Sequence, residues 1–547
     1  MIQKIKNTIV VLAGLFILNA CDLTLIPESD LSDEVFWRSD SEFRQALNYF
    51  YKLIEIAPGN EMDYPLMSDV MSDNAVSETF NAVGNGSYIP GSDFGPWDRD
   101  YQIIRTANNI IEQAEEYESE TVPRIIAEAR FFRAYAYADL LRRYGGVPLI
   151  MKTLDTNDEE LYAPRASRDE VMDVIYADLD NAIANLPAAS ELVIEDEYGL
   201  VTSGTALALK SRAALREGTW NKFHNGSNFQ THLQIAKEAA LQVMQNNEYE
   251  LFKPNESTGY TELFKMPGEG PENKEVIWAF PYGVNSTVNI RTTNYGALTS
   301  QGWCGMSKSF ADDFLCIDGL PIDKSPLFQG WESATSEFEN RDPRLNGTVV
   351  KKGDRYTIGD PYIPNLTSLT GYTVYKYFDQ AGGQSVNRYI DLMLIRYAEV
   401  LLNYAEAAFE LEDAISDADL DMSINVLRDR VGVAHLSNSF AAENGLNIRE
   451  EIRRERRSEL GMEGFRYDDL LRWKTAETEL PKEVLGVRLF AAEYPGVDPA
   501  GINLTADSIV IAEPASKRNF DPSKHYLWPL PLNQIALNPN LEQNPNW

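Results

Sequence analysis

The stretch from Glu128 to Pro148 constrains the fold more than any other part of the chain. Its apolar side chains recur at steps of three and four residues, which places them on one face of a helix: Phe132, Tyr135, Ala136, Leu140 and Tyr144. Alanines between them keep the helix thin, so neighbouring helices can approach closely. Gly145, Gly146 and Pro148 then end the helix, because glycine tolerates positive φ and proline cannot continue a helix. We therefore expect a core helix within a helical array.

The same spacing predicts further helices on both sides of this one. They are expected over residues 42–56, 100–117, 168–186, 202–220, 229–246, 388–411, 416–431 and 447–460. Residues 275–282 are expected to form a strand, and residues 373–378 a shorter one. Helix pairs of this kind suggest tetratricopeptide-like stacking, although no strict repeat is visible. The expected fold class is mainly α, with irregular tetratricopeptide-like helix pairs forming a scaffold, long loops and a few short strands.

The N-terminus has the features of a lipoprotein signal peptide. Lys4 and Lys6 precede the apolar run Val10–Leu18, which is too short to span a bilayer as a stable helix. The sequence Leu-Asn-Ala-Cys that ends at Cys21 resembles the bacterial motif at which the signal peptidase cuts before a lipid-carrying cysteine. Acyl chains would anchor the chain firmly, since each buried methylene contributes about 0.8 kcal/mol. An ordinary secretory peptide with a chance cysteine is the alternative.

This start sets the expected domain organisation. We expect a lipoprotein signal peptide over residues 1–20, an acylated tether over 21–40, and one α-helical domain over 41–547. Within that domain we distinguish an N-terminal half, 41–270, from a C-terminal half, 271–547.

Charge and cysteine content narrow the function classes. The formal net charge is −34, which argues against nucleic acid and against docking on anionic lipid headgroups. Neutral or cationic partners are favoured instead. Beyond Cys21, only Cys304 and Cys316 remain, too few for a disulfide scaffold. Free buried thiols are expected, with pairing of the two left open.

No motif for catalysis or for a cofactor is present. The chain has no Gly-x-Ser-x-Gly elbow, no His-Glu-x-x-His and no phosphate-cradling glycine loop. Asp417, Asp419 and Asp421 begin like a calcium loop, but Met422 stands where glycine is needed and Arg428 where a bidentate acid is needed. An aspartate-rich helix N-terminus is the plainer account. We expect no enzyme activity, no cofactor and no metal site, although a structural cation such as calcium stays open without a motif.

Five blocks, in order behind the lipidation motif, resemble the RagB/SusD family of outer-membrane nutrient-binding lipoproteins. They are Glu128–Pro148, Arg341–Arg344, Arg396–Ala407, Glu455–Trp473 and the ending Tyr526–Trp547. The resemblance covers essentially the whole chain after the signal peptide. These blocks predict scaffold, with charged residues that pair between helices: Glu399, Glu406, Glu455, Arg456, Glu463 and Arg466. Asparagines of the ending are expected to cap helices.

The resemblance implies a function in nutrient uptake and polysaccharide utilisation. Such a protein is lipid-anchored in the outer membrane and faces the cell exterior. It captures an oligosaccharide or polysaccharide and delivers it to a SusC-like TonB-dependent outer-membrane barrel. The implied partners are that barrel, the glycan and the membrane through Cys21. A peptide or other nutrient bound by the same fold is an alternative. So are a surface glycoside hydrolase that uses a pair of the many carboxylates and a pure interaction scaffold.

In that family the ligand site lies on variable loops, and two loop regions here are rich in residues that suit sugars. Aromatic faces pack on the C–H faces of sugar rings, and planar polar groups bond paired hydroxyls. The first region holds Asp73, Asn74, Tyr88, Phe94 and Trp97; the second holds Tyr282, Arg291, Asn294, Tyr295, Trp303 and Trp331. Trp303 is the best candidate, since flanking glycines would expose it. Packing within the loop is the competing interpretation for each aromatic residue, most of all for Trp97.

Overall fold

A computed structural model describes most of the chain after the tether. The described residues are 36–54, 68–78, 81–91, 95–254, 259–282, 304–354, 366, 369–378, 390–494 and 497–547. The expected signal peptide and the lipidation site Cys21 lie outside these residues, so both remain predictions.

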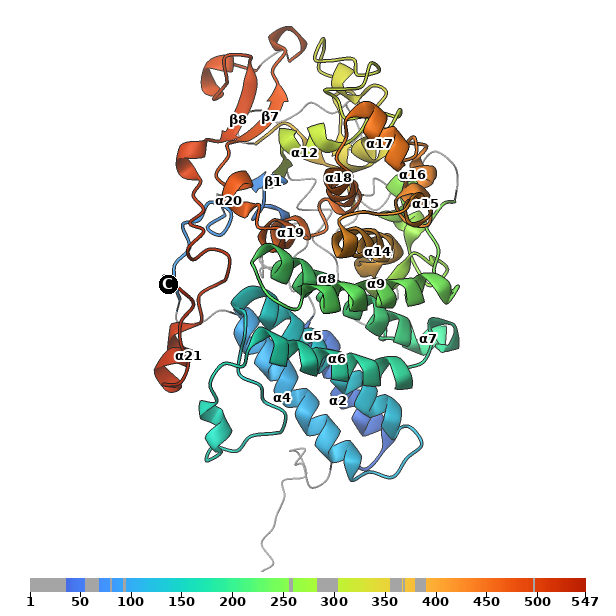
Figure 1. The fold of residues 1–547 in the computed structure, drawn as a ribbon, viewed down its shortest axis with the longest axis vertical. Helices are drawn as coiled ribbons and strands as arrows, with labels where there is room; N and C mark the ends of the chain where they lie inside the picture. The colour runs from blue at the N-terminus through green and yellow to red at the C-terminus, as the bar shows by residue number, and fades with distance from the viewer. Residues whose placement is uncertain are drawn as a thin grey trace, which may run out of the picture.

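The N-terminal half is a stack of long helices in chain order, each in contact with the next (Figure 1). The helices are α2 (Asp40–Leu53), α4 (Gly95–Glu115), α5 (Val122–Tyr144), α6 (Arg168–Asn185), α8 (Ser203–Phe223) and α9 (Phe229–Gln245). Each was predicted, with its ends displaced by a few residues, where helices fray. The mainly α fold class is therefore confirmed.

Helix α5 is the buried centre of this stack. Phe132, Ala136, Leu140 and Tyr144 are inaccessible to solvent, which confirms the apolar face expected from the sequence. Gly145 ends the helix with φ of 78°, a conformation that favours glycine. Asn544, from the far end of the chain, donates a hydrogen bond to the Tyr144 carbonyl oxygen at 3.0 Å. The expected capping by the asparagine-rich ending is thus confirmed at this helix.

The C-terminal half combines shorter helices with small sheets (Figure 1). Its longest helices are α14 (Tyr397–Glu412), α18 (Ile448–Leu460) and α16 (Ile424–Val431), and the shorter α19 (Arg466–Arg472) follows α18. Shorter α-helices across the chain are α7 (Ile194–Glu197), α10 (Gly259–Leu263), α12 (Lys308–Asp313), α13 (Pro343–Thr348), α15 (Asp417–Asp421), α17 (Asn438–Asn444), α20 (Ala476–Glu479) and α21 (Leu532–Leu537). The single helix predicted over residues 416–431 is therefore two, α15 and α16.

Three small antiparallel sheets accompany the helices. One has the order β1-β3-β5-β4, from Ala75–Ser77, Cys304–Met306, Thr373–Val374 and Val349–Val350. The second pairs β2 (Val276–Phe280) with β6 (Leu392–Arg396), and the third pairs β7 (Val484–Arg488) with β8 (Ile509–Glu513). The prediction of helix from residue 388 was wrong for β6. This apolar run fits either a helix or a buried strand, and pairing with β2 decides for the strand.

A buried ionic network holds the C-terminal half together. The Glu459 carboxylate is bound by Arg430 at 2.5 Å, Arg396 at 2.6 Å and Arg344 at 2.9 Å, all inaccessible or nearly so. Burial alone would raise the pKa of Glu459, but these three arginines hold it well below its usual range. Arg396 also binds Glu463 at 2.7 Å. The Glu459 carboxylate on α18 therefore links this helix to β6, α13 and α16.

The charged residues that were expected to pair between helices are all paired. The pairs are Glu399 with Arg212, Glu406 with Arg472, Glu455 with Arg428, Arg456 with Asp469, Glu463 with Arg396, and Arg466 with Asp73. Only Glu463 and Arg466 take partners outside a helix. Cys304 and Cys316 are free buried thiols, which settles the pairing left open by the sequence.

Candidate functional site

In the first loop region, Asp73 and Asn74 lie in the interior. Arg457 and Arg466 bind the Asp73 carboxylate at 3.0 and 2.8 Å. Burial alone would raise the pKa of Asp73, but the two arginines lower it strongly. Asn74 donates to Asp69 at 2.7 Å and accepts from Arg457 at 2.8 Å. These contacts join the segment around residue 73 to α18 and α19, so both side chains have protein partners in place of a ligand.

The two described aromatic residues of this region are also packed. Tyr88 is buried, with its ring centroid 4.8 Å from that of Trp547. Trp97 lies within α4 and contacts Tyr144 edge-to-face at 5.0 Å. Both therefore fit the packing interpretation. Phe94 lies outside the described residues.

The second loop region is described only at its edges. Arg291, Asn294, Tyr295 and Trp303 lie outside the described residues, and their role stays a prediction. Tyr282 lies two residues after the end of β2 and is half-buried, and its backbone N–H donates to the Asp391 carboxylate at 2.7 Å.

Trp331 lies at the other end of the second loop region and is also half-buried. Its ring lies 5.2 Å from Phe328 edge-to-face, with the Lys308 ammonium 4.4 Å above its centroid. Tyr282 and Trp331 are therefore the predicted site residues that keep partial solvent access in the described part.

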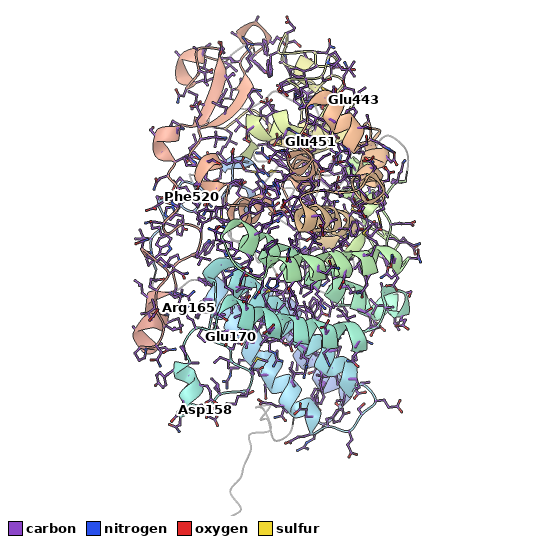
Figure 2. The ribbon with its side chains drawn as sticks, in the orientation of Figure 1. Asp158, Arg165, Glu170, Glu443, Glu451 and Phe520 are labelled. Carbon is purple, nitrogen blue, oxygen red and sulfur yellow. The ribbon has the colours of Figure 1, made fainter. Side chains whose placement is uncertain are left out.

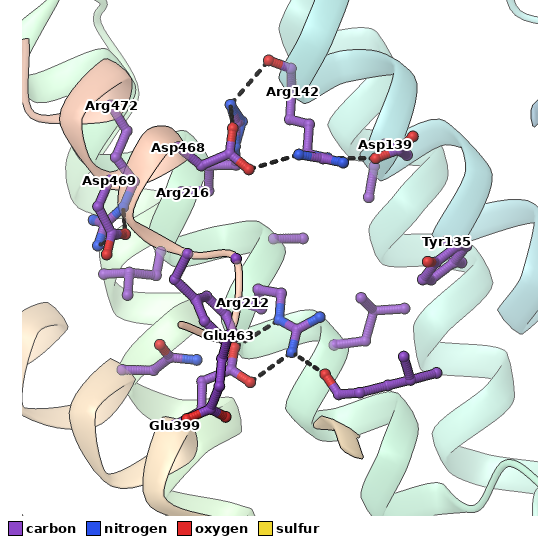
Figure 3. A pocket seen from close by; sticks show the side chains of 18 of the residues that line it. Tyr135, Asp139, Arg142, Arg212, Arg216, Glu399, Glu463, Asp468, Asp469 and Arg472 are labelled. Atoms are coloured by element: carbon purple, nitrogen blue, oxygen red, sulfur yellow. Dashed lines mark hydrogen bonds and ion pairs between the residues drawn. The ribbon is translucent and has the colours of Figure 1, made fainter. Parts of the chain in front are cut away.

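A cavity of about 230 Å³, which no sequence signal indicated, lies between the two halves of the chain (Figure 3). Figure 3 shows arginines and carboxylates facing one another around it. Arg212 binds Glu399 at 2.6 Å, while Arg142 and Arg216 share Asp468 at 2.6 and 3.2 Å. Its walls come from many separate stretches of sequence between Ile54 and Arg472, so no local motif could reveal it. The charges pair with one another, and apolar side chains such as Met172, Leu209 and Phe465 form much of the remaining wall, so the cavity is a seam of paired charges between apolar patches.

Burial affects the charges of this seam unequally. It lowers the pKa of Arg216 to about 10. The negative charge of Asp468 opposes this shift, whereas the positive charges of Arg142 and Arg168 add to it.

A second cavity, of about 460 Å³, lies between α4 and α21 and has mostly apolar walls. Among the described residues, no three His, Cys, Asp or Glu side chains gather closely enough to hold a metal ion. Nor does any described helix combine the length and apolarity of a membrane span.

The chain matches two models of known protein families. The model described as "Starch-binding associating with outer membrane" matches residues 27–215, and the model of the SusD family matches residues 270–547, more than half of the chain. The chain belongs to the SusD family. The RagB/SusD resemblance of the five sequence blocks is thereby confirmed. The name of the first model indicates association with the outer membrane.

Individual SusD-like proteins match over nearly the full length. SusD-like protein P38 of Formosa agariphila is 26% identical over 99% of both chains. A SusD-like carbohydrate-binding protein of Bacteroides fragilis, known from a crystal structure, is 26% identical with a TM-score of 0.78, covering 93% of this chain and 100% of that one. A laminarin-binding SusD-like protein has a TM-score of 0.63 at 19% identity, with coverage of 93% and 100%. At that identity the last comparison supports the fold alone.

Proposed function

We propose that the chain is a lipid-anchored protein of the outer-membrane surface that binds a glycan and delivers it to a SusC-like TonB-dependent barrel. Membership of the SusD family carries this proposal, because one matching model is described by starch binding and outer-membrane association. The carbohydrate-binding relative from Bacteroides fragilis supports it, since the two share fold and length. The action would be capture and transfer, without bond chemistry.

We assign ligand contact to the second loop region. Trp303 and Tyr295 would supply flat apolar faces, while Arg291 and Asn294 would bond paired hydroxyls. Tyr282 and Trp331 would flank them, since partial solvent access leaves ring surface for contact. In the first region, Phe94 alone stays a proposed contact, because the other four residues are buried.

Attachment to the membrane would run through Cys21. The segment between Cys21 and Phe36 can span at most about 50 Å when fully extended, which leaves the folded part close to the membrane surface. Cys21→Ala should therefore release the protein into the medium or periplasm, which fractionation and radiolabelled palmitate would detect.

Isothermal calorimetry of the chain without residues 1–21, against a panel of plant, host and microbial polysaccharides, tests the ligand assignment. We expect binding to at least one glycan, weakened roughly tenfold by Trp303→Ala or Tyr295→Ala. Tyr49→Ala is the matched control, since Tyr49 is an exposed aromatic residue on α2. Binding to a peptide alone, or turnover of the polysaccharide, would replace the proposal with one of its alternatives.

A further inference from the structure

Exposed apolar side chains gather at one place on the surface. Among the described residues, six of the eleven exposed large apolar side chains are Ile89, Met151, Leu161, Tyr162, Leu532 and Leu537. Leu161, Tyr162 and Leu537 line the cavity of about 460 Å³, and Met151 lies between two residues that line it. Leu532 donates its backbone N–H to Gly91, two residues from Ile89. A cluster of this kind marks an interaction surface on a water-soluble fold.

The walls of this groove are fixed by the fold. They are α4, the chain after α5 with a 3₁₀ turn at Glu159–Tyr162, and α21. The Asn538 amide, at the end of α21, donates to the Ala163 carbonyl oxygen at 2.9 Å, which ties α21 to that turn. Figure 1 places α21 at the lower left edge of the molecule, and Figure 2 places Asp158 close by. The groove is therefore preformed and opens outward.

The rim of the groove is acidic. Asp98 and Glu160 line the groove, and Asp155, Asp158 and Glu159 lie in the same surface segment as Glu160. Two cations accompany them, and both have partners: Lys152 binds Glu160 at 2.7 Å and Arg105 donates to the Leu154 carbonyl oxygen at 2.8 Å. The rim thus complements a basic surface, whereas a second copy of the chain would bring acid against acid.

The floor of the groove suits protein side chains better than a sugar. The Tyr101 hydroxyl already donates to the Pro148 carbonyl oxygen at 2.9 Å, and the Asn538 amide is bound to Ala163. These polar groups are satisfied internally, so mainly apolar surface remains for contact. An exposed tyrosine and leucines next to such a floor resemble the apolar centre of a protein interface, with a polar rim around it.

We propose that this groove and its acidic rim are the docking surface for a partner protein that presents apolar side chains beside basic ones. The inference rests on the proposed function, which supplies the outer-membrane barrel as that partner. It adds where the barrel is held and by which chemistry. The seam of paired charges between the two halves and the second loop region take no part in it.

Recovery of the barrel with the full acylated chain tests this surface. The chain is purified with an antibody from detergent-solubilised outer membranes, and barrel protein per chain is measured by mass spectrometry over a dilution series. The groove variant carries Tyr162→Ser and Leu537→Ser. The control variant carries Val193→Ser and Ile317→Ser, which are also exposed apolar residues but lie elsewhere. We expect roughly 30-fold weaker retention for the groove variant and unchanged retention for the control.

The charge of the partner is tested separately. Replacing the four acids at residues 155, 158, 159 and 160 by their amides, with Asp98 kept, should flatten the decline of retention with salt, because fewer attractive charge pairs remain to be screened. An unchanged salt dependence would contradict a basic partner surface.

The outcomes separate this inference from the proposed function. Equal retention by groove and control variants would overturn the docking surface and leave the proposed function intact. If the wild-type chain retained no barrel, the partner itself would be refuted, and the inference with it. A wild-type chain that is dimeric by light scattering, with a monomeric groove variant, would assign the surface to a second copy and also overturn the inference.

Discussion

The two halves of this molecule differ in how much buried charge they hold: the N-terminal stack has ion pairs at Asp139 and Asp178, and the C-terminal half has many more. In the N-terminal stack, thin alanine-rich faces and aromatic rings fill the space between helices, as where Phe132 stacks on Phe50 at 4.6 Å. In the C-terminal half, the centre is ionic, with Glu459 bound by Arg344, Arg396 and Arg430. Apolar packing tolerates gradual change, whereas a buried charge that loses its partner leaves a large uncompensated desolvation cost. The C-terminal half should therefore be the more fragile.

Removing the centre of the ionic network should have the largest effect. Glu459→Ala leaves three buried guanidinium groups without their common carboxylate, which we expect to lower the free energy of unfolding by about 4 kcal/mol. Chemical denaturation would measure it. Glu443→Ala, at an exposed position on α17, is the control and should change stability by less than about 0.5 kcal/mol. Similar values for the two variants would refute the distinction between the halves.

Lowering the pH should have the second-largest effect on stability, and it should act through the C-terminal half. Burial alone would raise the pKa of Glu406, but Arg472, followed by Arg456 and Trp473, lowers it to about 2 from the usual 4.5. The folded state therefore binds fewer protons than the unfolded state between these values. The stabilisation is present above pH 4.5 and is lost as pH falls towards 2, by about 3 kcal/mol.

Glu406→Gln tests this share of the acid sensitivity. The variant should be less stable than wild type at pH 7 and should show a flatter dependence of unfolding free energy between pH 4.5 and 2. Parallel pH profiles for the two proteins would show that this carboxylate does not contribute.

Enlarging a buried side chain tests the close helix packing of the N-terminal stack. Ala136 is fully buried in α5 between its neighbours, so Ala136→Leu should cost about 2 kcal/mol. Ala138, two residues on, borders the cavity of about 230 Å³, where a leucine side chain finds room. Ala138→Leu should therefore change stability little. Equal costs in thermal unfolding would contradict the account of close helix packing.

The smallest expected effect concerns the link between the ends of the chain. Asn544→Ala removes the hydrogen bond to the last carbonyl of α5 and a second one to Trp528. A loss of about 1 kcal/mol is expected in denaturation experiments, because the net contribution of such bonds is small. Glu542→Ala, at an exposed position nearby, should be neutral.

The fold could be predicted where one local pattern decides it. The helical spacing around Phe132 and the glycine after Tyr144 fixed α5 with little ambiguity. The strand Leu392–Arg396 was missed because its apolar run is compatible with either structure until β2 pairs with it. The pair of β7 and β8 also went unpredicted, since its strands are separated by a long connection. Long-range pairing is therefore the part that local patterns omit.

The candidate site divides in the same way. Residue type alone could not separate Asp73, which binds two buried arginines of the C-terminal half, from an acid that faces a ligand. Nor could a local pattern join Glu459 to Arg344, which lies more than a hundred residues away. The apolar groove beside α21 is lined by segments from both ends of the chain, so no local motif predicts it.

Affinity and stability measured together on the same proteins test the central claim, that loops bind the ligand and the two halves only support them. The set is wild type, Trp303→Ala, Tyr295→Ala and Ala136→Leu, each assayed for polysaccharide binding by calorimetry and for unfolding by denaturant. We predict that the two loop variants lose affinity roughly tenfold at unchanged stability, and that Ala136→Leu loses about 2 kcal/mol of stability at unchanged affinity. Loop variants that bind like wild type, beside a scaffold variant that loses affinity while folded, would contradict it.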